Sequence, residues 1–287
     1  MKMNLLYVLP FQGIGDIMIT LGYLNEYIQK NGFQKAILFY VKGYEELYSF
    51  YDFDFAKKVA ISKNCYRLLK TFFSTKIGQF VLRIRKDILC TDTIFYVGKS
   101  WKTIFTISGL SVFKFIKEGI MGLNVSSKII SPKIPNIHME LQSDAKNKKI
   151  AVMNPYSKTI LISAWQDVYK RLSQDLIELG YFVFTDCGKD KSKKAIEGTL
   201  PFYGGLAESF ELCKNASVVI GTRSGYLDLM LLSGTKTIAI YDADKENCIS
   251  MNAFNIEETA RLFGMSENNC FQIRADETEK LQALLAS

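Results

Sequence analysis

The sequence is poor in the residues that build metal and redox centres. It has one histidine, His138, and six cysteines with no C-x-x-C pair among them. A multi-histidine metal site within one chain is therefore excluded, and only one candidate remains for a Ser-His-Asp triad. Because His138 lies in a proline-containing connecting stretch, we expect no catalytic role for it. The chain opens without a secretory signal pattern, so we expect buried, reduced thiols in a cytoplasmic protein.

Long apolar runs and flexible tracts are also missing. No run of 18 or more uncharged apolar residues occurs, which predicts no transmembrane helix. The best candidate, 103–116, is short and interrupted by Lys114, so we expect a buried or membrane-surface helix there. Five prolines and no Gly/Ser/Pro tract exclude a long flexible linker. With 287 residues and 48% hydrophobic content, the chain can form two packed domains.

Positive charge is concentrated in the first half of the chain. The net charge is +7, yet Lys57 to Lys117 holds 13 lysines and arginines against two acids, a local excess of +11. Such a stretch suits nucleic acid, anionic lipid or an acidic acceptor, and a merely solvated basic face is the alternative. It contains no recognition-helix or RNA-binding signature, so we expect no nucleic-acid partner. We interpret it as a face that meets an anionic membrane or a phosphate-bearing lipid acceptor.

Apolar strands and amphipathic helices alternate along the chain, which predicts an α/β fold with parallel sheets covered by helices. In the first half we expect strands at 5–9 and 36–41, weaker strands at 59–61 and 93–97, and a helix at 17–29. In the second half we expect four strands, at 150–153, 181–185, 218–220 and 237–241, and helices at 164–179, 210–215, 226–233, 257–263 and 277–285. The proline-containing, polar stretch from Pro132 to Lys149 predicts a boundary, giving domains 1–145 and 146–287.

The most informative turn is Gly221-Thr222-Arg223-Ser224-Gly225, which joins a buried strand to a helix. Ser224 suits the N-cap position, and Gly225 lets a ligand approach the backbone closely. Backbone N–H groups and the helix dipole favour a diphosphate here, and Arg223 adds forked donors that match phosphate oxygens. Asp228 could accept from ribose or sugar hydroxyls. The alternative is an ordinary helix cap in which Arg223 is ion-paired to Asp228.

A second turn, Asn154-Pro155-Tyr156-Ser157-Lys158, also follows a strand. Open α/β sheets bind ligands beyond the carboxyl ends of their strands. Lys158 is a candidate phosphate partner, and Asn154 and Tyr156 are candidates to orient the sugar or the loop. A plain β-turn with an exposed lysine is the alternative.

The third turn is Gly13-Ile14-Gly15-Asp16, near the start of the chain. Gly13 and Gly15 match a fragment of the dinucleotide-binding fingerprint, but the third glycine is missing and an acid stands in the turn. A carboxylate at a helix N-terminus repels phosphate and stays ionised. We therefore predict that Asp16 faces an acceptor hydroxyl as general base, with Gly13 and Gly15 beside the acceptor. The alternative is that Asp16 only caps its helix.

Together the three turns resemble those of bacterial GT-B glycosyltransferases related to the heptosyltransferase group. In that group a glycine-rich turn ends in Gly-Asp, so Asp16 falls on the proposed base. The Asn-Pro turn after Val152-Met153 and the donor loop Val218 to Gly225 also match the group. Heptosyltransferases usually have an acid at the position of Arg223 and a histidine at that of Asp228. The resemblance therefore implies the architecture rather than heptose as the sugar, and it is closest to uncharacterised transferases of polysaccharide gene clusters.

This resemblance implies two Rossmann-like domains facing a central cleft, the GT-B architecture. The second domain would hold a nucleotide-diphosphate-sugar, and the terminal helix is a candidate to pack back on the first. The implied reaction is an inverting, metal-independent transfer to a cell-surface polysaccharide, lipopolysaccharide or lipid-linked glycan, without a cofactor. The implied location is the cytoplasm, at the inner face of the membrane. A nucleotide-sugar epimerase or hydrolase on the same scaffold, or a non-catalytic basic binder of nucleic acid or lipid surfaces, are the alternatives.

Overall fold

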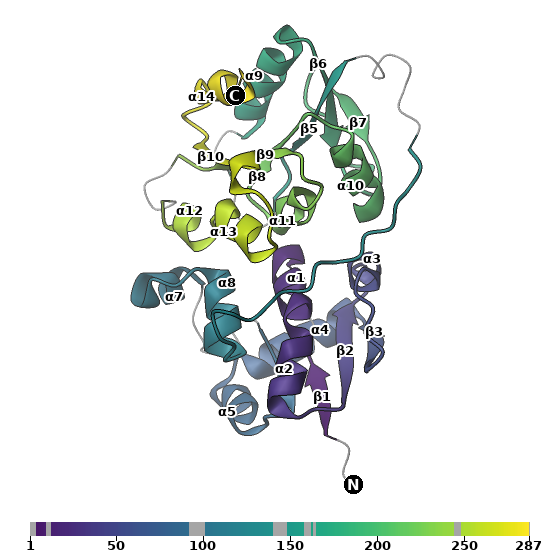
Figure 1. The fold of residues 1–287 in the computed structure, drawn as a ribbon, viewed down its shortest axis with the longest axis vertical. Coiled ribbons are helices and arrows are strands. Elements are labelled where there is room, and N and C mark those ends of the chain that lie inside the picture. Colours follow the sequence, from purple (N-terminus) through teal and green to yellow (C-terminus); the bar gives the residue numbers. More distant parts are fainter. Residues whose placement is uncertain are drawn as a thin grey trace. The chain divides into compact units, whose positions relative to one another are not determined.

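The computed structural model describes residues 4–9, 13–91, 101–139, 148–157, 162, 165–243 and 248–286. The chain divides into two compact units, Met1–Lys133 and Ile134–Ser287, here called unit 1 and unit 2. Each unit has its own parallel β-sheet with helices packed against it (Figure 1).

Unit 1 begins with alternating strands and helices and ends in helices. Its elements are β1 (Leu5–Val8), α1 (Ile14–Gly22), α2 (Leu24–Asn31), β2 (Lys35–Val41), α3 (Glu45–Ser49), β3 (Ala56–Ile61), α4 (Lys63–Phe73), α5 (Lys76–Ile84), β4 (Ile88–Leu89), α7 (Trp101–Ser108), α8 (Val112–Lys114) and the π-helix η1 (Phe115–Ile120). The strand predicted at 93–97 lies outside the described residues.

The sheet of unit 1 has the order β3-β2-β1-β4, with every neighbouring pair parallel. Helix α1 follows the central strand β1 and is buried along almost its whole length, because its residues are apolar or small on nearly every side. The prediction of a single helix at 17–29 is wrong, because the structure has two helices there. Tyr23 separates α1 from α2, and Gly32 in the left-handed conformation ends α2.

The apolar stretch 103–116 does not form the single helix expected from the sequence. Gly109 adopts a φ of +66° after α7, and the chain restarts as α8 and the π-helix. Among the described residues, no helix combines the length and apolar character needed to cross a membrane.

Unit 2 continues the alternation of strands and helices. Its elements are β5 (Lys149–Asn154), α9 (Trp165–Glu178), β6 (Tyr181–Asp186), β7 (Leu200–Phe202), α10 (Leu206–Lys214), β8 (Val218–Thr222), α11 (Gly225–Leu231), β9 (Lys236–Tyr241), α12 (Cys248–Ala253), α13 (Ile256–Leu262), the 3-10 helix η4 (Glu267–Asn269), β10 (Cys270–Arg274) and α14 (Lys280–Ala286).

The sheet of unit 2 has six parallel strands in the order β10-β9-β8-β5-β6-β7. Counted from β5, this is the order of the doubly wound dinucleotide-binding fold. In that fold the strands are added toward one edge first and then, from the fourth strand on, toward the other edge, so the order reverses between the first and fourth strands. The reversal therefore lies between β5 and β8. Four of these strands were predicted from the sequence; β7 and β10, at the two edges, were missed.

Helices α9 and α14 pack on one face of this sheet (Figure 1). Their apolar side chains, such as Tyr169, Leu172 and Leu281, form one core with alternate residues of the strands, such as Met153 and Ile220. Alternation along each strand turns the intervening residues to the opposite face, where α11 contacts β9 and α13 contacts β10. Both faces are thus covered, which explains why the central strands are continuously apolar.

The cysteines agree only partly with expectation. Cys90, Cys187, Cys213 and Cys270 are free and buried, whereas Cys65 is exposed on α4, so the prediction of uniformly buried thiols is wrong there. His138 is exposed in a coil segment that precedes β5 in the chain.

Candidate functional site

The candidate site lies at the carboxyl edge of the unit 2 sheet, where β5 and β8 end side by side. Asn154 is the last residue of β5 and pairs in register with Gly221, one residue before the end of β8. A Cβ atom at Gly221 would lie 2.8 Å from the carbonyl oxygen of Asn154, too close for any side chain. The glycine thus lets the two predicted turns, 154–158 and 221–225, begin in contact.

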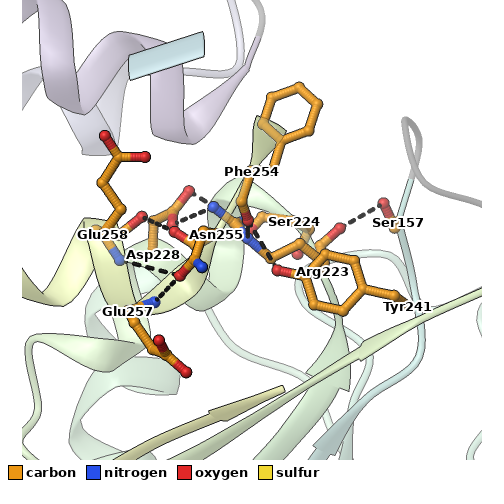
Figure 2. Close-up of polar contacts among 10 residues, drawn as sticks. Ser157, Arg223, Ser224, Asp228, Tyr241, Phe254, Asn255, Glu257 and Glu258 are labelled. Atoms are coloured by element: carbon orange, nitrogen blue, oxygen red, sulfur yellow. Dashed lines mark hydrogen bonds and ion pairs between the residues drawn. The ribbon is translucent and has the colours of Figure 1, made fainter. Parts of the chain in front are cut away.

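Side chains then fasten the two turns to each other. The Thr222 hydroxyl donates to the carbonyl oxygen of Pro155 (3.1 Å) and lies 3.0 Å from the Tyr169 hydroxyl of α9. The Ser157 hydroxyl donates to the carbonyl oxygen of Arg223 (3.4 Å; Figure 2). Thr222 is buried. The Thr222 hydroxyl therefore lies between the two turns and bonds them together. The predicted contact of Thr222 with the donor stays a prediction.

Arg223 is buried at the start of α11, with only 2% of the residue exposed. Its Nη2 atom lies 2.8 Å from Oδ1 of Asp228, and its Nη1 atom donates to Oδ2 of the same carboxylate (3.2 Å). Nη1 also donates to the carbonyl oxygen of Ser224 and Nε to that of Phe254, both at 2.7 Å (Figure 2). The guanidinium fork is thus matched to a carboxylate, which is the ion-paired alternative considered for this turn.

The surroundings keep this arginine charged. Burial opposes the charge, but the Asp228 carboxylate and the Tyr241 hydroxyl outweigh burial and raise the pKa of Arg223. The Tyr241 hydroxyl also donates to the carbonyl oxygen of Phe254 (2.8 Å), the acceptor used by Arg223. Asn255, the next residue, caps α13 by accepting from the N–H groups of Glu257 and Glu258 (Figure 2). Arg223 therefore ties the turn to the start of α13.

Two oxygen atoms at this edge are buried without a hydrogen-bond partner among the described residues: Oδ1 of Asn154 and Oγ of Ser224. Ser224 occupies the predicted N-cap position, but its hydroxyl makes no cap bond to α11. Asn154 uses only its Nδ2 atom, which donates to the carbonyl oxygen of Asp186 (3.3 Å). Because buried polar atoms are usually satisfied, unpaired oxygens at the carboxyl edge of an open α/β sheet make Asn154 and Ser224 candidates to bind a polar group. Gly225, half-buried, opens α11 directly beside Ser224.

Sequence reasoning missed Asp186, which ends β6 beside Asn154. Its carboxylate accepts from the Tyr226 hydroxyl of α11 and from the N–H of Gly188 (2.7 Å). Burial raises the pKa of Asp186 above its ordinary value, although Ser209, Tyr226, Gly188 and Lys193 act against that rise. The signal was present in the sequence, because Asp186 is the polar residue that ends an apolar strand.

Tyr156 stands in an aromatic and basic cluster on the 154–158 turn. Its ring packs edge-on against Trp165 at 5.7 Å between centroids, and its hydroxyl donates to the carbonyl oxygen of Lys194. The ammonium of Lys193 lies 4.4 Å from the centre of the Tyr156 ring. Burial raises the pKa of Tyr156 to about 12, so its hydroxyl is neutral. Lys158, predicted to meet phosphate, lies outside the described residues; Lys193 is a cation beside the same turn.

Asp16 lies in the first turn of α1 in unit 1 and is half-buried. Gly13 holds the N-cap position of α1, so Asp16 stands inside the first turn and is not the N-cap residue. The pKa of Tyr44 is raised mainly by burial and, second, by the negative charge of Asp16. The Tyr44 phenol therefore lies near Asp16. Gly15 is buried in the same turn and Gly13 is half-buried. The catalytic role of Asp16 stays a prediction.

The first turns of α1 are anchored next to the end of β4. The Thr20 hydroxyl donates to the carbonyl oxygen of Asp16 (2.7 Å) and lies 2.7 Å from the hydroxyl of Thr91, two residues after β4. Since the order β3-β2-β1-β4 reverses between β1 and β4, Asp16 follows the strand at the switch point of its own sheet.

No family model matches the chain, and no curated protein sequence matches it. Solved structures share its fold. The ADP-heptose lipopolysaccharide heptosyltransferase II of E. coli is 12% identical, with a TM-score of 0.54 over 98% of both chains. The E. coli heptosyltransferase WaaC with ADP is 13% identical, with a TM-score of 0.54 over 98% of this chain and 99% of that one.

A third structure is a family 9 glycosyltransferase from Veillonella parvula. It is 10% identical, with a TM-score of 0.53 over all of this chain and 91% of the other. At such identities the likeness establishes the fold and leaves the site residues to be judged from their own geometry. This chain therefore has the α/β fold, with two parallel sheets, of the heptosyltransferases and other GT-B glycosyltransferases.

Proposed function

We propose that this protein is a glycosyltransferase that moves a sugar from a nucleotide-diphosphate-sugar to a cell-surface glycan or its lipid-linked precursor. The observation that carries the proposal is the joined pair of turns at the switch point of unit 2. There the unpaired oxygens of Asn154 and Ser224 lie at the edge where open α/β sheets bind ligands. The heptosyltransferase structures, one of them solved with ADP, support a nucleotide donor.

The donor is held by unit 2 in this proposal. The N–H groups of Ser224 and Gly225 and the Ser224 hydroxyl donate to the diphosphate, and Asn154 Oδ1 accepts from a ribose or sugar hydroxyl. Because Asp228 neutralises Arg223 in a buried pair, Arg223 acts as a positioning residue that fixes the turn. The positive charge that stabilises the leaving diphosphate then comes from Lys158 and Lys193.

The reaction itself uses one base. Asp16 takes the proton of an acceptor hydroxyl while the acceptor oxygen bonds to the anomeric carbon. The bond between that carbon and the diphosphate oxygen breaks, and the nucleoside diphosphate leaves with the electron pair. Attack opposite the leaving group inverts the anomeric centre. We expect no metal cofactor, so activity should be equal with and without a chelator.

The acceptor side faces the membrane in this proposal. The basic stretch from Lys57 to Lys117 favours a lipid-linked or phosphate-bearing acceptor at the inner, anionic leaflet. The protein would then act in the cytoplasm as a peripheral membrane enzyme.

A thermal-shift screen against common nucleoside diphosphates tests the donor site. A ligand at 100 times its dissociation constant adds about 2.7 kcal/mol of stability, so a matching nucleotide should raise the Tm clearly. The variant Ser224→Ala should reduce this rise in Tm. The control variant Ser192→Ala, which changes an exposed residue between β6 and β7, should leave the rise unchanged.

Each outcome of that screen bears on the proposal. If no nucleoside diphosphate or nucleotide-sugar raises the Tm, the donor site is refuted. If nucleotide-sugar is bound but its sugar is released or inverted without any acceptor, the protein is an epimerase or hydrolase on the same scaffold, and the transferase proposal is refuted. Product from a supplied glycan acceptor, with an inverted linkage by NMR, supports the transferase.

A further inference from the structure

The helical hairpin α4–α5 (residues 63–84) of unit 1 exposes large apolar side chains. Leu68 is 72% exposed and Ile77 70%. The full set on the hairpin is Leu68, Phe72, Ile77, Phe80 and Ile84. Single exposed apolar residues are common on proteins, but five on two adjoining helices form a surface that needs an explanation.

These residues follow the periodicity of a second helix face. On α5, Ile77, Phe80 and Ile84 are spaced i, i+3 and i+7, so they line one side of the helix. A different stripe of α5, containing Gly78 and Leu82, is buried. The same holds on α4, where Leu68 and Phe72 are exposed and the stripe with Tyr66 and Phe73 is buried. Each helix therefore packs with one apolar stripe and presents another to the outside.

The hairpin is firmly built, so fraying does not explain the exposure. The Thr75 hydroxyl donates to the carbonyl oxygen of Phe72 (2.7 Å) and accepts from the N–H of Gly78 (3.0 Å), which caps α5. A Cβ atom on Gly78 would overlap the Phe72 carbonyl, so glycine permits the tight reversal between the helices. Underneath, Phe73 and Leu82 pack in a core cluster with Cys90. Helices α4 and α5 contact each other along the hairpin (Figure 1).

The charged residues of this hairpin are all basic. Between positions 63 and 86 the sequence has seven lysines and arginines and no acid, and all seven are exposed. Five lie on the hairpin, namely Lys63, Arg67, Lys70, Lys76 and Arg83; Arg85 and Lys86 follow it directly, and Arg85 is ion-paired with Asp87 (2.6 Å). Lys76 and Arg83 lie four residues before and three residues after Phe80, so they border the exposed stripe of α5.

We propose that the α4–α5 hairpin is the element that binds this protein to an anionic lipid bilayer. Its apolar stripe enters the interface between headgroups and acyl chains, and its lysines and arginines contact the headgroup phosphates. The aliphatic residues favour a lipid bilayer over a nucleic acid as the partner. Leu68, Ile77 and Ile84 can neither stack on bases nor pair with phosphates, whereas they gain free energy in the acyl region. The inference rests on the proposed membrane partner and is independent of the donor chemistry.

Vesicle flotation tests the proposal. The full chain should float with vesicles that contain phosphatidylglycerol, float less as salt is raised, and stay behind with vesicles of phosphatidylcholine alone. The variant Ile77→Gln/Phe80→Gln keeps every charge and should bind on the order of tenfold more weakly or worse. The variant Lys76→Gln/Arg83→Gln should weaken binding by about 25-fold, at a factor of about five for each charge.

A matched control comes from unit 2. Ile177 and Leu179 are 43% and 47% exposed at the end of α9, so Ile177→Gln/Leu179→Gln removes two similar side chains from another surface and should float like the unmodified chain. As a depth probe, Phe80→Trp should be quenched by brominated lipids more strongly than Leu179→Trp. Unchanged Tm and unchanged stabilisation by nucleotide confirm that the hairpin variants are folded and separate this test from that of the donor site.

Three results would overturn the proposal. The first is wild-type binding that the Ile77/Phe80 variant does not reduce, or that the unit 2 control reduces equally. The second is tight binding to RNA with no flotation. The third is equal quenching of the two tryptophan probes.

Discussion

In both sheets the strand order reverses beside the first strand, but the turns at this switch point differ between the units. In unit 1 the helix after β1 has Gly13 at its N-cap, and a carboxylate, Asp16, stands in its first turn. In unit 2 the turn after β8 contains Arg223, whose charge is buried against Asp228 and whose donors hold two backbone carbonyls. The switch point thus carries a half-buried acid in one unit and, in the other, a turn whose arginine is buried in an ion pair. This difference fits a reacting group in unit 1 and a preorganised binding edge in unit 2.

The strongest test of this difference is to remove the acid. The substitution Asp16→Ala should lower turnover by about 10²–10⁴-fold, because the acceptor hydroxyl loses its base, while nucleotide still raises the Tm as in wild type. Asp54→Ala, which removes an exposed acid from the same unit, serves as the control and should keep full turnover. Loss of nucleotide binding in the Asp16 variant would show that the acid belongs to the donor site instead.

Breaking the buried pair in unit 2 should act on stability. Arg223→Met or Asp228→Leu alone leaves an uncompensated buried charge, and each should cost about 3–5 kcal/mol in urea unfolding. The double variant Arg223→Met/Asp228→Leu should recover much of that loss, because no charge is left unpaired. Additive losses in the double variant would contradict the coupling. An Arg223→Met variant of normal stability with weakened nucleotide binding would instead identify Arg223 as a direct phosphate ligand.

The Ser224 hydroxyl provides a smaller and more selective test. Since it has no hydrogen-bond partner among the described residues, Ser224→Ala should leave the unfolding free energy nearly unchanged. If the hydroxyl donates to the diphosphate, the same variant should bind nucleotide about tenfold more weakly, the loss of one hydrogen bond to a charged group. Calorimetric titration measures the affinity. A stability loss above about 1 kcal/mol would mean that the hydroxyl serves the fold.

The smallest expected effect is a slope in the pH dependence of stability. Burial raises the pKa of Asp186 in the folded protein above 3.8. As pH rises through and above that value, the unfolded chain loses its proton first, so folding becomes less favourable until the folded carboxyl also ionises. The Tm of wild type should therefore fall relative to that of Asp186→Asn as pH increases from about 4. A constant or widening advantage of wild type over this range would contradict the assignment.

The central strands could be predicted because their chemistry is local. Ile150 to Met153 and Val218 to Ile220 are apolar runs of the kind that a sheet covered on both faces requires. The strands that were missed lie at the sheet edges. There β7 is Leu-Pro-Phe and β10 mixes polar with apolar residues, so neither has the apolar run used to recognise a strand. The break at Tyr23 was also missed, because the residues on either side continue a helical apolar pattern.

In the candidate site, too, some features could be predicted from the sequence and others could not. The sequence correctly places Asn154 where a strand ends and Ser224 at the N-cap of the helix that follows a strand, because the end of an apolar run marks the carboxyl edge of a sheet. It cannot decide whether Arg223 meets a ligand or Asp228, because the choice depends on the Phe254 carbonyl, distant in the chain, which supplies another acceptor in the interior. Likewise the basic stretch is visible in the sequence, but the second apolar face of its hairpin becomes apparent only when burial separates the two stripes.

The contacts between the turns after β5 and β8 have a consequence for protein engineering. Gly221 leaves no room between the strands, Thr222 bonds Pro155, and Ser157 bonds Arg223, so the two segments behave as one piece. Under the proposed function, exchanging only the segment after β8 with that of another enzyme, in order to alter sugar preference, would break these contacts. A chimera that carries both segments as a cassette keeps those contacts and has the better prospect of folding with a changed specificity.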